Sequence, residues 1–152
     1  MNKTIRVIYI SLSGNTTHFV KKLSEYLNLW HDVTVNATDV YTLVKNKEAF
    51  KEETVPFVAI LPTYLEGGNG HETGTTEILT TPLREYLRFN DNYKHCKGIV
   101  GSGNKNFNDQ YCLTAKQYSE EFSFPVLDNF ELRGTDQDVI RIADKIMQIL
   151  NE

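Results

Sequence analysis

The sequence is poor in cysteine, has no long hydrophobic run and carries no excess of positive charge. Its two cysteines, Cys96 and Cys112, cannot form the disulfide framework of a small secreted domain and are typical of a reducing cytoplasm. The longest apolar run, Val55–Leu61, is interrupted by Pro56 and is much shorter than the ~18 residues of a membrane span. A formal net charge of −4 argues against a general nucleic-acid binder, which usually carries a basic stripe.

Two further absences narrow the expected location and chemistry. The apolar segment Ile5–Ile10 is too short for the core of a secretory signal and contains Arg6, so we expect a cytoplasmic protein that does not bind membranes. The histidines show no ligand spacing with cysteines or carboxylates, which predicts that the chain holds no metal ion; they are His18, His31, His71 and His95.

The remaining composition is that of an ordinary globular protein. Hydrophobic residues make up 40% and charged residues 24% of the 152 residues. A chain of this length can bury a sizeable core but has no room for a second one. We therefore expect residues 1–152 to form a single domain that is monomeric when alone.

Short β-rich apolar runs alternate with segments of helical period. The expected strands are Ile5–Ile10, Val33–Ala37, Val55–Leu61, Gly98–Gly101 and Val126–Phe130. The expected helices are Thr16–Leu29, Tyr41–Lys47, a segment from Pro82 through Leu87, Cys112–Phe122 and Val139–Leu150. Thr81 and Asp109 are the expected N-caps of the third and fourth helices.

This alternation favours an α/β fold with three layers. Repeated strand–helix units predict a five-stranded parallel sheet with right-handed crossovers and helices on both faces. The nearly continuous apolar character of the third run is typical of a parallel strand that is covered on both faces. We expect the strand order 2-1-3-4-5, in which the first and third strands flank the point where the order reverses.

Glycine and hydroxyl side chains gather directly after three of the expected strands. The segments are Ser11–Thr16, Pro62–Gly70 and Gly101–Asn108, and they contain most of the glycines. Ligands of open α/β sheets bind outside the carboxyl ends of the strands, at the point where the strand order reverses. With the expected strand order, the three segments line one crevice.

The first of these segments has the composition of a phosphate site. Ser11, Ser13 and Thr16 offer hydroxyl groups, Asn15 offers an amide, and Gly14 lets the backbone approach a ligand closely. The N–H groups and the dipole of the following helix favour an anion at the same place. The segment contains no Lys or Arg, so neutral donors would bind the phosphate. A serine-rich cap on an ordinary helix is the alternative interpretation.

The second and third segments are suited to a flat ring. Tyr64 and Phe107 each follow a strand end, where an aromatic side chain can stack on a planar heterocycle or pack into the core instead. Other phosphate motifs do not match. In Gly98–Lys105, Asn104 separates the second glycine from the lysine of a P-loop pattern, and Asn106 stands where a dinucleotide fingerprint needs its third glycine.

With these motifs in place, the chain resembles the NrdI family, the flavodoxin-like proteins that serve class Ib ribonucleotide reductase. The resemblance covers nearly the whole chain. It rests on four motifs: Ser11–Thr16, Pro62-Thr63-Tyr64 with the glycines that follow, Gly101–Phe107, and Phe130–Thr135, which ordinary flavodoxins lack. Flavodoxins, which hold flavin mononucleotide (FMN) where the strand order reverses, are a known example of the crevice rule.

The resemblance implies FMN as cofactor, bound by the three segments. The phosphate would lie on the first segment, and the ring between the other two. The implied binding residues are Ser11, Ser13, Gly14, Asn15, Thr16, Pro62, Thr63, Tyr64, Leu65, Glu66, Gly67, Gly68, Ser102, Gly103, Asn104, Asn106 and Phe107.

The resemblance also implies a function. Members of the family help to assemble the dimanganese–tyrosyl radical cofactor of the reductase small subunit. The reduced flavin supplies electrons or a superoxide-level oxidant, and the redox chemistry belongs to the flavin rather than to side chains. The implied partners are that small subunit and a flavin or thiol reductase as electron donor. A general electron-transfer flavodoxin and a non-redox nucleotide- or partner-binding module remain as alternatives.

Overall fold

The computed structural model describes residues 3–66, 76–77, 79–104 and 112–151. Its main sheet has five parallel strands in the order β2-β1-β3-β6-β7, which confirms the predicted order. The strands are β1 (Lys3–Tyr9), β2 (Val33–Asp39), β3 (Phe57–Leu61), β6 (Cys96–Gly103) and β7 (Val126–Glu131).

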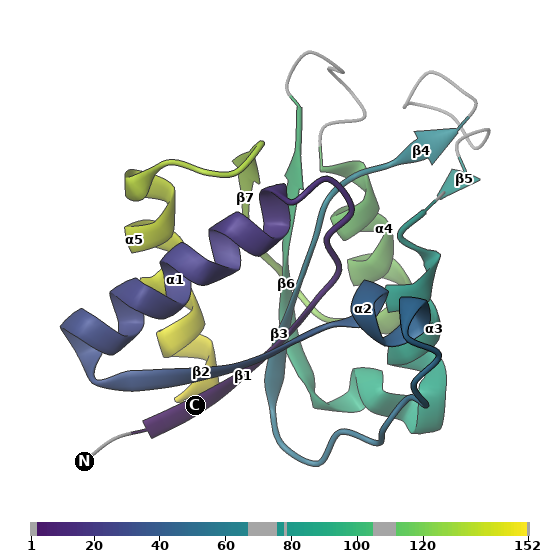
Figure 1. Cartoon of the computed structure of the whole chain (residues 1–152), viewed down its shortest axis with the longest axis horizontal. Coiled ribbons are helices and arrows are strands. Elements are labelled where there is room, and N and C mark those ends of the chain that lie inside the picture. Colours follow the sequence, from purple (N-terminus) through teal and green to yellow (C-terminus); the bar gives the residue numbers. More distant parts are fainter. Residues whose placement is uncertain (1–2, 67–75, 78, 105–111, 152) are drawn as a thin grey trace.

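Helices cover both faces of this sheet, so that the molecule has three layers (Figure 1). On one face lie α1 (Asn15–His31) and α5 (Asp136–Leu150). The other face carries α2 (Val40–Lys45), α3 (Thr81–Arg88) and α4 (Leu113–Phe122). A 3₁₀ segment, η1 (Phe89–His95), joins α3 to β6. A separate antiparallel pair is formed by β4 (Leu65–Glu66) and β5 (Thr76–Glu77).

The hydrophobic core consists of two clusters that are separated by the sheet. In β3 every residue is buried, because its alternate side chains enter opposite clusters. Val58 and Ile60 pack on the α1 and α5 side, whereas Phe57, Ala59 and Leu61 pack on the α3 and α4 side. Each fully buried Val, Leu, Ile or Phe contributes about 1.5–3 kcal/mol relative to exposure. The prediction that the third strand is covered on both faces is confirmed.

Three details differ from the sequence-based expectations. The third strand begins at Phe57 rather than Val55, which is 48% exposed and precedes Pro56. The N-cap of α3 is Thr80, so that Thr81 is already helical. The N-cap of α4 is Cys112, whereas the expected cap Asp109 lies outside the described residues.

The fourth strand is longer than expected, since β6 continues through Gly103. The glycines at its end therefore belong to the sheet and not to a loop. A Cβ atom on Gly101 would lie 2.6 Å from the Cβ of Ala115, so glycine is needed here for the close approach of α4. None of the helices in the described ranges is long and apolar enough to cross a membrane.

Candidate functional site

The carboxyl ends of β1, β3 and β6 lie at one edge of the sheet and are tied together by hydrogen bonds. The Ile10 amide donates to the carbonyl oxygen of Ile60 at 3.2 Å, which holds the end of β1 against β3. The Thr63 hydroxyl donates to the carbonyl oxygen of Ser102 at 2.9 Å, which holds the segment after β3 against β6. The parallel topology thus places the described parts of the three segments that the sequence singled out at one edge of the sheet.

The turn between β1 and α1 leaves the start of the helix open. Gly14 is the N-cap of α1, has a left-handed φ of 93° and supplies no side-chain cap. A Cβ atom built on Gly14 would meet no atom of the described residues within 4 Å other than its chain neighbours, so these residues leave the space beside the turn open. The first N–H groups of a helix need acceptors, and the dipole at this end favours a negative charge. An anion fits this position.

The Thr16 side chain strengthens that interpretation. Thr16 is only 1% exposed, and its Oγ1 has no hydrogen-bond partner within the part of the chain that the structure describes. A buried hydroxyl without a partner costs free energy. Because Thr16 lies in the first turn of α1, an anion at the open helix start would give this hydroxyl an acceptor.

Ser11 has a different role, because it organises the turn itself. Its Oγ accepts a hydrogen bond from the Thr17 amide at 3.1 Å, and its own amide donates to Asp39 Oδ1 at 3.3 Å. The same Asp39 oxygen accepts from the Tyr41 amide at 3.0 Å and so caps α2. Burial raises the pKa of the Asp39 carboxyl, and hydrogen bonds from Tyr41, Ser11 and Thr42 partly offset this rise. Of the other predicted phosphate ligands, Ser13 is exposed and Asn15 is half-buried.

The residues predicted to hold a ring are described only in part. Pro62, Thr63, Tyr64, Gly103 and Asn104 are half-buried at the same edge of the sheet. Ser102 is 2% exposed and lies within β6. Its carbonyl oxygen accepts the hydrogen bond from Thr63 that connects β6 to the neighbouring segment. The backbone of Leu65 and Glu66 forms β4. The predicted positions Gly67, Gly68, Asn106 and Phe107 lie outside the described residues.

A buried carboxylate anchors β5, and sequence analysis did not find it. Glu77, with its side chain 5% exposed, accepts hydrogen bonds from Thr80 Oγ1 at 2.5 Å, Tyr118 Oη at 2.6 Å and Arg84 Nε at 2.8 Å. We call these four residues the Glu77 cluster. The cluster joins β5, which pairs with β4, to α3 and α4.

The electrostatics of the Glu77 cluster keep the Tyr118 hydroxyl protonated. Burial, followed by the negative charge of Glu77, raises the pKa of the Tyr118 hydroxyl far above its usual range, so Tyr118 remains a hydrogen-bond donor. The Arg84 guanidinium lies 4.5 Å from the centre of the Tyr118 ring, a favourable cation–π distance. The donors come from residues up to 41 positions away from Glu77, so no local sequence pattern reports the cluster.

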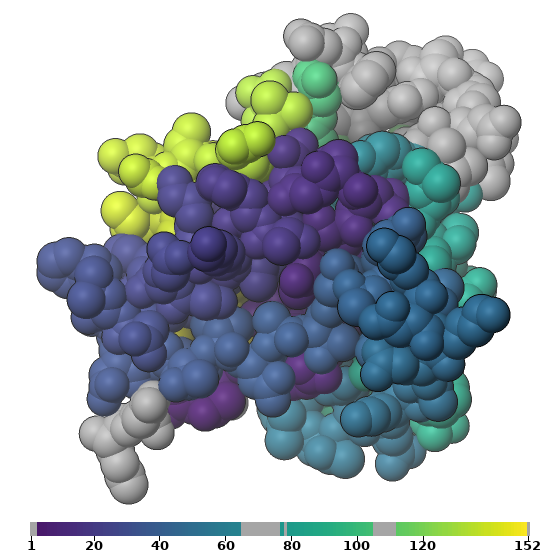
Figure 2. Space-filling model, viewed as in Figure 1, coloured from purple at the N-terminus to yellow at the C-terminus, as the bar shows by residue number. Residues whose placement is uncertain are grey.

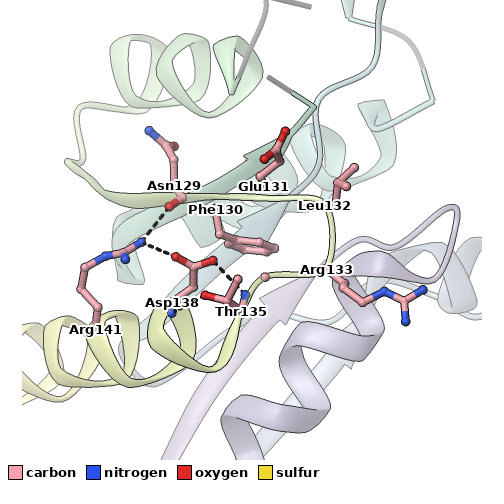
Figure 3. Close-up of a pocket in the computed structure, with 9 residues that line it drawn as sticks. Asn129, Phe130, Glu131, Leu132, Arg133, Thr135, Asp138 and Arg141 are labelled. Atoms are coloured by element: carbon pink, nitrogen blue, oxygen red, sulfur yellow. Dashed lines mark hydrogen bonds and ion pairs between the residues drawn. The ribbon is translucent and has the colours of Figure 1, made fainter. Parts of the chain in front are cut away.

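A pocket of about 530 Å³ lies beside the segment that connects β7 to α5 (Figure 3). We call this segment, from the last residue of β7 to the N-cap of α5 (Glu131–Thr135), the β7–α5 loop. Leu132 adopts a left-handed φ of 55° although it is not glycine, and Gly134 has a φ of 79°. The Leu132 amide donates to the carbonyl oxygen of Gly103 at 2.9 Å, which attaches the loop to the end of β6. Thr135 and Asp138 form a reciprocal capping box at the start of α5.

Comparison with known proteins agrees with this architecture. The family model described as "NrdI Flavodoxin like" matches residues 7–144. An NrdI-like protein of Streptococcus pyogenes is 53% identical over 147 residues, which cover 94% of this chain and 92% of the relative. Protein NrdI of Bartonella bacilliformis is 35% identical over 135 residues, 88% of each chain.

Solved structures show the same fold at low sequence identity. A short-chain flavodoxin associated with a bacterial microcompartment has a TM-score of 0.59 and 19% identity, covering 96% of this chain and 97% of its own. Oxidised flavodoxin 2 from Bacillus cereus has a TM-score of 0.56 and 15% identity, covering 98% of both chains. The prediction of a flavodoxin-like sheet with helices on both faces is confirmed.

Proposed function

The chain belongs to the NrdI flavodoxin-like family, and we propose that it binds FMN and helps to assemble the dimanganese–tyrosyl radical cofactor of a class Ib ribonucleotide reductase small subunit. Membership of the family supports a flavin as the cofactor. The choice of FMN rests on the chemistry of the β1–α1 turn, which suits a single terminal phosphate.

The observation that carries this proposal is the buried Thr16 hydroxyl without a partner at an open helix start. A phosphate there would accept hydrogen bonds from Thr16 Oγ1 and from the first N–H groups of α1. Gly14 leaves the approach free of side-chain atoms, and Ser11 keeps the turn in shape through its bond with the Thr17 amide. Ser13 and Asn15 complete the proposed phosphate ligands.

The flavin ring would be held by the segments that follow β3 and β6. The bond between Thr63 and Ser102 fixes their spacing, and Tyr64 supplies an aromatic face. The β4–β5 pair, anchored through the Glu77 cluster, would set the position of the chain beside the ring. We include Pro62, Leu65–Gly68, Gly103, Asn104, Asn106 and Phe107 among the proposed ring ligands.

When bound, FMN would supply the redox chemistry, namely the electrons that reduce oxygen to the superoxide-level oxidant needed at the metal site of the docked small subunit. The protein's own residues bind the cofactor, orient it and determine its electrostatic surroundings. A flavin or thiol reductase would return electrons to the protein. We propose a monomeric cytoplasmic protein, in agreement with two buried cysteines, Cys96 and Cys112, that form no disulfide within the described residues.

The proposed role is tested by radical formation. Reduced, FMN-loaded protein is mixed with the dimanganese small subunit of the same organism and oxygen, and the tyrosyl radical is measured by electron paramagnetic resonance. We expect a radical signal that depends on all three components. A general electron carrier, in contrast, would support an unrelated flavodoxin-dependent reaction and give no radical, and that result would contradict the proposed role.

A further inference from the structure

We propose that Arg133 is the cationic ligand of the phosphate received by the β1–α1 turn. This inference rests on the proposed binding of FMN and adds a residue far away in the sequence. The turn itself contains no Lys or Arg, although a phosphate monoester carries a charge of about −1.5 to −2 at neutral pH. A cation brought in from another segment would balance this charge.

Followed backwards from the start of α5, the β7–α5 loop runs along α1 towards the first turn of that helix. Asp136, at the start of α5, pairs with Lys22 in the second turn of α1. Two residues earlier, a Cβ atom on Gly134 would lie 2.7 Å from Cδ1 of Phe19, so the loop backbone packs directly on this side chain of α1. Moving two residues back along the loop thus corresponds to three residues back along α1. By this register, Arg133 reaches the level of the first turn of α1, where Thr16 lies.

A second attachment brings the loop to the crevice itself. The amide of Leu132 donates to the carbonyl oxygen of Gly103, which lies at the carboxyl end of β6. Arg133 therefore follows a residue that is fixed at the edge of the proposed site. The space-filling view agrees, because the yellow-green segment after β7 borders purple atoms at the start of α1 (Figure 2).

Arg133 is the positively charged residue of this loop, and its charge is not balanced by an ion pair with the described residues. Its neighbour Arg141 is paired with Asp128 and Asp138. Asp136 is paired with Lys22. Arg133, in contrast, is exposed and makes no ion pair with the residues that the structure describes. Its side chain points away from the Asp138–Arg141 pair (Figure 3). A guanidinium group suits a phosphate particularly well because its parallel N–H groups match two phosphate oxygens.

The backbone of the loop is also unusual in a way that a ligand would explain. A left-handed φ at a non-glycine residue is strained, and Leu132 holds it next to Arg133. Gly134, on the other side of Arg133, has a φ of 79°. Between these two left-handed residues, the Arg133 side chain points out of the loop (Figure 3), and the bond to Gly103 holds Leu132 in place.

The test compares ligands that differ only by the phosphate. Apoprotein is titrated with FMN and with riboflavin, followed by flavin fluorescence, in the wild type, Arg133→Gln and Arg133→Lys. Lys21→Gln is the matched control, since it removes one exposed positive charge from the second turn of α1. A third arm measures the rise in melting temperature of each apoprotein with inorganic phosphate, which needs no flavin ring.

We expect Arg133→Gln to weaken FMN binding about 10- to 100-fold, which is the range expected for loss of a charge-assisted hydrogen bond. Riboflavin binding should stay within about twofold of the wild type. Arg133→Lys should restore part of the loss, Lys21→Gln should bind like the wild type, and phosphate should stabilise the wild type more than Arg133→Gln. Equal loss of FMN and riboflavin, or unchanged FMN binding, would overturn the inference alone. A wild type that binds neither flavin nor phosphate would overturn the proposed function together with it.

Discussion

The rings of Phe19 and Phe130 stack with their centroids 3.9 Å apart and their planes 12° apart. This contact joins α1 to β7 within the core cluster on the α1 and α5 face. Since α1 begins at the candidate site and β7 leads into the β7–α5 loop, the stack sets the relative positions of the two segments that we assign to phosphate binding.

Replacing Phe130 with alanine tests the importance of this stack. Phe130 is 1% exposed, so Phe130→Ala removes a fully buried ring and leaves a cavity. We expect the free energy of unfolding to fall by about 3–5 kcal/mol, measured by urea denaturation. The control is Trp30→Ala, whose side chain is 70% exposed and should change stability by no more than about 0.5 kcal/mol. Equal effects of the two variants would contradict the assigned packing.

Thr16→Val separates binding from folding. Valine keeps the shape of threonine but lacks the buried hydroxyl that has no partner in the described apoprotein. We therefore expect the apoprotein variant to be at least as stable as the wild type, because the polar group no longer pays desolvation. FMN affinity should fall by about 1–3 kcal/mol, measured by calorimetric titration. Loss of apoprotein stability without loss of affinity would show that the hydroxyl has a structural partner instead.

Removal of the Glu77 carboxylate should loosen the attachment of β5. In Glu77→Ala, the buried Tyr118 hydroxyl and the Arg84 guanidinium lose their common acceptor. We expect a loss of stability of about 1.5–3 kcal/mol from the lost hydrogen bonds to a charged group, although Arg84 keeps its ion pair with Glu121 and Tyr118 can still donate to the Thr80 carbonyl. Tyr118→Phe removes a single hydrogen bond and should cost about 1 kcal/mol. Urea denaturation of both apoproteins gives the comparison, and a milder effect of Glu77→Ala than of Tyr118→Phe would contradict the cluster.

The ion pairs of Arg141 make a pH-dependent contribution. Burial opposes ionisation of Asp128 and Asp138, but hydrogen bonds outweigh it and lower the pKa of both carboxyls, with Arg141 donating to each. A lowered folded pKa stabilises the protein above the unfolded pKa of about 4, and this stability is lost as the pH falls through the folded value.

Arg141→Gln should therefore be less stable than the wild type at pH 7, and the difference should shrink at pH 3. Urea denaturation at the two pH values measures both differences. Arg133→Gln is the control because it removes the same charge from the neighbouring loop without breaking a described ion pair. A difference between Arg141→Gln and the wild type that does not change with pH would contradict the assigned role of Arg141.

The sheet and most helices could be predicted because their patterns are local. The continuous apolar run in β3 reflects a strand that is buried on both faces of the sheet. The helical period of α5 reflects the burial of one face of that helix. The end of β6 was harder, because glycine commonly marks a loop. Gly101 is instead required within a strand by the approach of Ala115. Sequence alone does not distinguish a glycine chosen for its φ from one chosen for its size.

The sequence indicated where a candidate site would lie, but not the tasks of its individual residues. The Ser11–Thr16 pattern indicated a phosphate turn, yet only the structure shows that Ser11 accepts from the Thr17 amide while Thr16 Oγ1 remains without a partner. The Glu77 cluster and the approach of Arg133 to α1 depend on contacts between distant segments. Such contacts follow from topology and packing, which no short motif encodes.

The most direct test of the account is a crystal structure of the protein with FMN. We predict that the phosphate lies within hydrogen-bond distance of Thr16 Oγ1 and the first amides of α1, with the ring beside Tyr64 and Asn104. A flavin bound elsewhere, or a crevice that remains empty at saturating FMN, would contradict the central claim.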